Sequence, residues 1–122
     1  MINSKQKGSR GERLFSKLCR DEGFDNVHRT AQYRGNTGDA GDCEGLPNIH
    51  IEVKYTEHLQ LSKAMAQSIR DSTANGKGHL PIVAHKKNRE EWLITMRAED
   101  WFKLYREYYS SYELDRLKAE QE

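Results

Sequence analysis

Hydrophobic and polar positions alternate along residues 49–55, and this alternation is the clearest structural signal in the chain. Ile49, Ile51 and Val53 are apolar, and a polar residue stands between each neighbouring pair. A period of two over this length predicts a β-strand with one buried and one exposed face. The preceding "DCEG" and "LPN" predict another strand that is joined to the first by a short hairpin loop.

Other segments have the spacing of helices. Apolar residues recur every three or four positions in "SRGERLFSKLCRDEGF", which predicts a first helix over residues 9–24 that stops near Gly23. Ser9 and Glu12 at its start match a capping box. A second helix is predicted over "LSKAMAQSIRDST", and a long last helix begins at about Glu99.

The remaining apolar runs are short and predict strands. "FDNVHRT" is a short strand, "LPIVAH" a buried one and "EWLITM" another, whereas Thr30–Gly41 is rich in Gly and Asn and predicts an exposed, loosely held loop. The order is helix, three strands, helix, one or two strands, helix. We therefore expect an α/β domain over residues 1–122, in which three antiparallel strands precede a strand that can lie parallel after the helical crossover.

The last helix carries an apolar stripe that predicts either a core contact or a subunit interface. Its members are Trp101, Leu104, Tyr105, Tyr108 and Tyr112.

Composition excludes several classes of protein. Charged residues make up 32% of the 122 residues, and no apolar run is long enough to cross a membrane or to act as a secretory signal. Cys19 and Cys43 form no CxxC pair and the five histidines lack zinc-ligand spacing, so we expect reduced thiols in a cytoplasmic protein without a zinc site. The net charge is +1, but basic residues gather before residue 21 and acidic ones after residue 98. One basic face could therefore meet a polyanion.

The hairpin brings acidic residues together. A three-residue loop places Asp42 directly across from Glu52, whereas a two-residue loop would shift this pairing by one. Glu52 and Lys54 share one face of the same strand. Two carboxylates held together repel each other unless a cation or a proton intervenes, and hard oxygen ligands suit Mg²⁺ or Mn²⁺.

The acid followed by Glu-x-Lys, from Asp42 to Lys54, resembles the core of the PD-(D/E)xK nuclease superfamily. With "GER" in the first helix, it is similar to the small archaeal-type Holliday junction resolvases and their phage-encoded relatives. The resemblance implies a restriction-endonuclease-like fold, a mixed sheet flanked by helices. It also implies a catalytic set of Glu12, Asp42, Glu52 and Lys54, with the Val53 carbonyl among the metal ligands.

Some assignments stay open. Gly41 replaces the nominal proline of the motif, Asp39 could replace Asp42 as a ligand, and Glu12 has an alternative role in the capping box. Gln67 on the second helix either faces the site or, as we favour, lies at the surface. The basic residues expected to contact DNA are Lys7, Arg10, Arg13, Arg29, Arg34, Lys86, Lys87 and Arg89.

The sequence thus predicts an Mg²⁺- or Mn²⁺-dependent endonuclease that cuts branched DNA, above all four-way junctions, and leaves a 5′-phosphate and a 3′-hydroxyl. Two symmetric nicks require a homodimer, and no small-molecule cofactor is expected. A phage origin would place the protein in the host cytoplasm. The alternatives are a nuclease for flaps, forks or single strands, and a DNA-binding module with a degenerate site.

Overall fold

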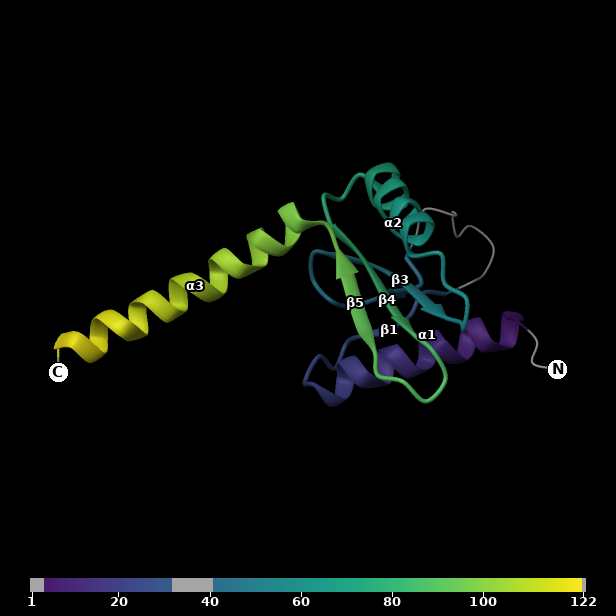
Figure 1. Cartoon of the computed structure of the whole chain (residues 1–122), viewed down its shortest axis with the longest axis horizontal. Helices are drawn as coiled ribbons and strands as arrows, with labels where there is room; N and C mark the ends of the chain where they lie inside the picture. The colour runs from purple at the N-terminus through teal and green to yellow at the C-terminus, as the bar shows by residue number, and fades with distance from the viewer. Residues whose placement is uncertain (1–3, 32–40, 122) are drawn as a thin grey trace.

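The computed structural model describes residues 4–31 and 41–121, which form a five-stranded sheet with helices around it (Figure 1). The strands lie in the order β1-β2-β3-β4-β5, and only β3 and β4 are parallel. Both the element order and the parallel crossover through α2 are confirmed. The elements are α1 (Ser4–Asp21), β1 (His28–Arg29), β2 (Cys43–Glu44), β3 (Ile49–Tyr55), α2 (Leu61–Asn75), β4 (Leu80–Lys86), β5 (Leu93–Met96) and α3 (Ala98–Gln121).

The first helix begins earlier than the sequence predicts, and the capping box is therefore wrong. Because α1 already starts at Ser4, Ser9 lies inside the helix, where its hydroxyl accepts a hydrogen bond from Arg29 instead of capping the end. The stop at Gly23 is confirmed. Its φ of 102° lies in the left-handed region, and the Phe24 N–H closes the helix end on the Cys19 carbonyl at 3.0 Å.

The hairpin has the register that a three-residue loop requires. Cys43 lies opposite Ile51, and Asp42, directly before β2, follows with its N–H bonded to the Ile51 carbonyl, which brings it to the level of Glu52. A turn closed from the Ile49 N–H to the Leu46 carbonyl, 3.2 Å, connects the two strands.

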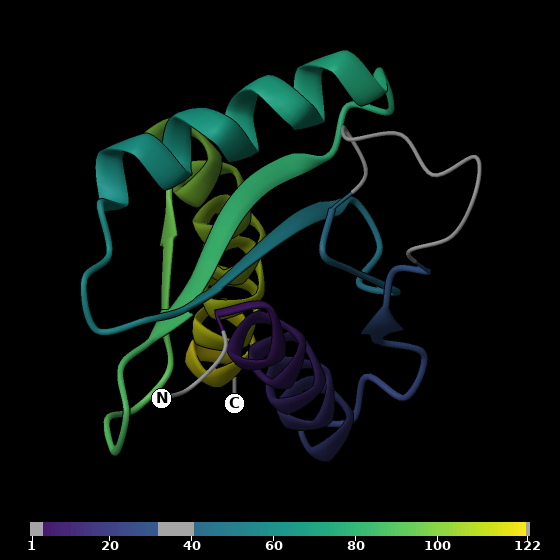
Figure 2. The same ribbon diagram turned by 90° about the vertical axis from the view of Figure 1, so that its right-hand side faces the viewer.

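The two faces of the sheet are covered by different helices (Figure 2). The α1 face is the apolar core, in which Phe15 packs with Ile51, Val53 and residues of β4. The polar face of β3 was expected to be exposed, and this expectation is wrong, because α2 lies over it and leaves Glu52 only 3% exposed.

The last helix projects away from the sheet (Figure 1). Its apolar side chains are exposed, from 41% at Tyr105 to 63% at Tyr108, so the core alternative for this stripe is wrong. Among the described residues, no helix is long and apolar enough to cross a membrane.

Candidate active site

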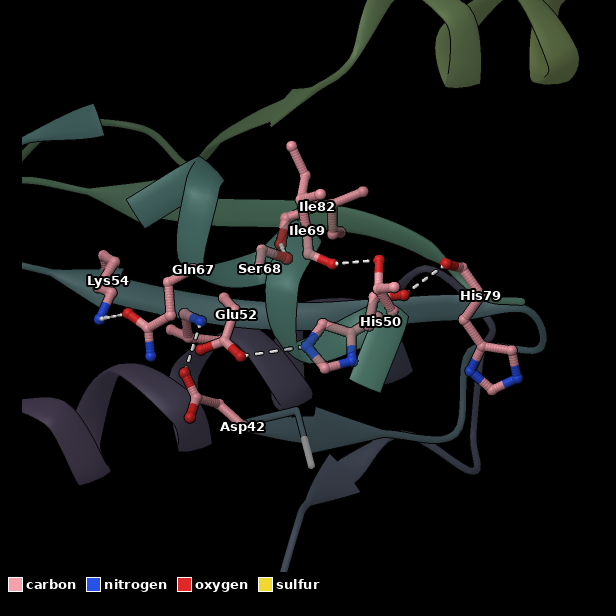
Figure 3. Close-up of polar contacts among 12 residues, drawn as sticks. Asp42, His50, Glu52, Lys54, Gln67, Ser68, Ile69, His79 and Ile82 are labelled. Atoms are coloured by element: carbon pink, nitrogen blue, oxygen red, sulfur yellow. Dashed lines mark hydrogen bonds and ion pairs between the residues drawn. The ribbon is translucent and has the colours of Figure 1, made fainter. Parts of the chain in front are cut away.

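Asp42 and Glu52 meet at the centre of the sheet (Figure 3). The backbone of Asp42 is fixed on both sides, because its N–H donates to the Ile51 carbonyl at 2.7 Å and its own carbonyl accepts from the Thr30 N–H at 3.0 Å. Its side chain accepts from the Val53 N–H at 2.8 Å, which turns the carboxylate toward β3. Two strands thus hold two acids side by side.

The environment of Asp42 disfavours its negative charge. Burial is the main cause, followed by the neighbouring charge of Glu52, and together with a smaller contribution from Glu12 they raise the pKa of Asp42 to about 7. The hydrogen bond from the Val53 N–H opposes this rise only in part. Without a metal, the Asp42 carboxyl therefore favours its protonated form below about pH 7, and a cation could replace that proton.

Lys54 points to the α2 side of the sheet, beside the acids (Figure 3). Its Nζ donates to Oε1 of Gln67 at 3.5 Å, which is a long and weak contact. Gln67 is half-buried there, so the surface role that we favoured for it is wrong. The sequence signal was present in the helical spacing, since Gln67 lies three residues after Ala64 and thus on the same side of α2.

Glu12 on α1 also lies near the acid pair and is itself paired. Its Oε1 accepts from Nε of Arg29 at 3.0 Å, and Nη2 of the same guanidinium donates to Ser9 at 3.2 Å. The charge of Glu12 nevertheless acts on Asp42, as the pKa of Asp42 shows. The structure therefore ties Arg29 to the candidate site and places Glu12 near the acid pair.

His50 is a site residue that the sequence analysis missed. Its Nε2 lies 3.1 Å from Oε1 of Glu52, and both side chains are only 4% exposed. The side chain of Asp71 on α2 completes a group of three ligand atoms that lie within 4.8 Å of one another. The period of two in β3 could have revealed His50, because it places His50 on the same face as Glu52. Its ring fixes the orientation of the Glu52 carboxylate.

Several of the basic residues predicted to contact DNA gather around Tyr55. Arg10, Lys86 and Arg89 line a groove of about 670 Å³ with this ring. Nζ of Lys7 lies 4.7 Å above the centre of the Tyr55 ring. Of the other predicted contacts, Arg13 and Lys87 are exposed, whereas Arg34 and the alternative ligand Asp39 lie outside the described residues, as does most of the predicted loop Thr30–Gly41.

Comparisons with known proteins give a family and a fold for this chain. A family model described as "Phage putative PDDEXK endonuclease" matches residues 3–121. Among solved structures, the chain is similar to Hjc of Archaeoglobus fulgidus, a Holliday junction resolvase from an archaeal hyperthermophile. The TM-score is 0.54 and the identity 25%, over 73% of this chain and 76% of that chain. No curated protein matches the sequence.

These findings confirm the restriction-endonuclease-like fold, with its mixed sheet flanked by helices, and the resemblance to Hjc-like nucleases. The family match covers almost every residue of the chain. The chain therefore belongs to the phage PDDEXK endonuclease family.

Proposed function

We propose that this protein is an Mg²⁺- or Mn²⁺-dependent DNA endonuclease with Glu12, Asp42, Glu52 and Lys54 as its catalytic set. The observation that carries the proposal is the pairing of half-buried Asp42 with buried Glu52, in which the pKa of Asp42 is raised to about 7. A fold seldom keeps two carboxylates this close together and away from water without a ligand for them. Hard oxygen donors without cysteine fit a hard divalent cation.

The proposed roles follow from the positions of the side chains. Asp42, Glu52 and the Val53 carbonyl would hold the ion, and Glu12 would reach it directly or through water. A bound ion lowers the pKa of a coordinated water and offsets negative charge on the phosphate. Lys54 stands beside the acids, where it would orient the attacking water or stabilise the charge that develops at phosphorus.

We infer that the preferred substrate is a four-way DNA junction. The similar Archaeoglobus fulgidus protein is a Holliday junction resolvase, and resolving a symmetric junction requires two symmetric nicks. The described chain holds one such acid pair, so two copies would have to act together. Flaps, forks and single strands remain the alternative substrates for the same catalytic set.

The second copy would pack against the exposed stripe of α3. Trp101 and Tyr105 stack at 5.0 Å between ring centres, and Tyr108 and Tyr112 continue the stripe along the helix. Two such helices crossing antiparallel about a twofold axis would cover both stripes at once. Charge favours this arrangement, since the exposed Glu99 in the first turn of one helix would approach Lys118 in the last turn of the other.

The assignment is tested by Glu52→Gln, which keeps the size of the side chain and removes its charge. With Mg²⁺, cleavage of a junction should fall by more than about 100-fold, because even partners outside the ligand shell are worth about 10–100-fold. Binding of the junction should persist, since removing an acid weakens no phosphate contact. The measurement is a cleavage panel of junction, fork, flap, duplex and single strand, together with a binding assay.

Glu44→Gln is the matched control, because Glu44 is an exposed acid on β2 that pairs with His28 outside the site. It should cut like the wild type. Full activity in Glu52→Gln would overturn the assigned site, and a wild type that binds but cuts none of the five DNAs would favour the binding module. Stronger cutting of flaps or single strands would refute only the preference for four-way junctions and would leave the nuclease assignment in place.

A further inference from the structure

A second positively charged groove opens on the α2 side of Lys54. It has a volume of about 500 Å³ and runs along the start and the outer side of α2. Among the described residues that line it, none is an aspartate or a glutamate. Its polar lining is Lys54, Thr56, His58, Gln60, Lys63, Gln67 and Arg70.

The N-terminus of α2 adds to the positive potential of this groove. Gln60 and Lys63 both line it, so the first turn of the helix forms one of its walls. In the part of the chain that the structure describes, no side chain caps this end, and its first turn contains no acidic residue. The unpaired N–H groups of a helix start attract anions, and phosphates are common ligands there.

The groove continues directly into the candidate active site. Lys54 lines it, and Gln67, which contacts Nζ of Lys54, lines it too. It differs from the groove around Tyr55, which lies at the α1 side of the sheet and includes the acidic Glu57. Thr56, the residue directly after β3, also lines the α2 groove.

We infer that this α2 groove binds the phosphodiester backbone of the DNA strand immediately beside the scissile phosphate; the inference rests on the proposed nuclease function. Lys63 and Arg70 neutralise backbone phosphates, and Ala64, Ala66 and Leu59 offer an apolar floor to the sugars. A lining that carries cations and no acids suits a polyanion. Because the groove adjoins Lys54, the strand bound in it is the strand that is cut. Neither Lys63 nor Arg70 was among the DNA contacts predicted from the sequence.

The test is the double variant Lys63→Ala/Arg70→Ala, made in the full chain and compared with Lys77→Ala/Arg106→Ala. The control removes the same charge from exposed positions outside the groove. Junction binding by the groove variant should weaken about tenfold near 0.1 M salt. The slope of its log K against log salt concentration should be smaller in magnitude by about 1.4–1.8. Binding without the two phosphate contacts releases fewer counterions. The control should keep both the wild-type slope and the wild-type kcat.

A second measurement locates the contacts on the DNA. Neutral methylphosphonate linkages on the phosphates next to the cleavage site should weaken binding by the wild type and by the control. They should add little to the loss in the groove variant, since its contacts are already absent.

A groove variant with the control's salt slope, or one that is weakened as much as the wild type by the neutral linkages, would overturn the inference. If the wild type still cuts DNA in that case, the nuclease proposal stands and only the groove fails. A wild type that neither binds nor cuts any DNA would overturn both.

Discussion

At the scale of single residues, the proton on Asp42 links the stability of the protein to its chemistry. The Asp42 carboxyl group lies beside Glu52. Burial, with the neighbouring charge of Glu52, raises the pKa of Asp42 to about 7 from an ordinary value of 3.8. The fold therefore favours the protonated acid, whereas metal binding requires the charged one. A bound cation and this proton compete for the same oxygen atoms.

We predict that the metal-free protein loses stability as the pH rises. Below pH 3.8 the folded and unfolded chains both carry this proton; between about pH 4 and 7 only the unfolded chain releases it, so unfolding becomes easier until the folded pKa is passed. Asp42→Asn cannot release a proton, so its melting temperature should fall less between pH 5 and 8.

The measurement is thermal unfolding in a metal chelator, with Asp25→Asn as an exposed control that should follow the wild type. Adding Mg²⁺ should raise the melting temperature of the wild type more at pH 8 than at pH 5, and that of Asp42→Asn at neither pH. Parallel curves for the wild type and Asp42→Asn would contradict the prediction.

At the scale of elements, the packing of α2 on the sheet sets the shape of the site. The helix meets β3 and β4 through small side chains, Ala64, Ser68 and Ser72. Ser68 donates to the Ile82 carbonyl at 2.9 Å and Ser72 to the His79 carbonyl at 2.6 Å. This close approach covers His50 and Glu52 and brings Gln67 to Lys54.

Enlarging Ser68 should separate the helix from the sheet. Ser68 is fully buried, so Ser68→Leu overpacks the contact and should lower the free energy of unfolding by about 1–3 kcal/mol. Cleavage should fall as well, because Gln67 moves away from Lys54. Ser68→Ala loses only one hydrogen bond, worth about 0.5–1.5 kcal/mol, and should keep cleavage. Urea unfolding and cleavage rates measure both effects, and full activity in a folded Ser68→Leu variant would argue against this role of α2.

At the scale of the whole molecule, α3 carries a large apolar surface that the rest of the described chain leaves uncovered (Figure 1). Exposed apolar stripes of this size mark interaction sites. In a monomer this apolar surface would stay in contact with water and would contribute nothing to stability. A second copy would bury them and would add the second active site that two symmetric nicks require.

We predict a dimer in solution with a mass near twice the 14.2 kDa of the chain. Tyr108→Glu places a charge within the stripe and should shift the protein to monomer. Because Tyr108 is 63% exposed, the fold of each chain should be unaffected. Ser110→Glu adds the same charge on the opposite side of α3 and should leave the dimer intact. Sedimentation of the three proteins decides the matter: a monomeric wild type, or a dimeric Tyr108→Glu, would exclude this interface.

The sequence alone determined the hairpin and the acid pair within it. The alternation through Ile49, Ile51 and Val53 sets which side chains share a face, and "LPN" allows two registers, of which the structure has the one that places Cys43 opposite Ile51. Both depend on strand geometry and on a turn of a few residues, which are local properties of the chain. The helix stop at Gly23 is local in the same sense.

Only the tertiary structure decided what covers these residues. Alternation along β3 cannot show whether its polar face meets water or another helix, and here α2 buries His50 and Glu52. The stripe at Tyr108 has the same sequence pattern whether it is buried or exposed. Because α1 starts before Ser9, Glu12 pairs with Arg29 instead of capping a helix. The reason is physical: burial and pairing depend on elements far apart in sequence, whose packing free energies no local pattern records.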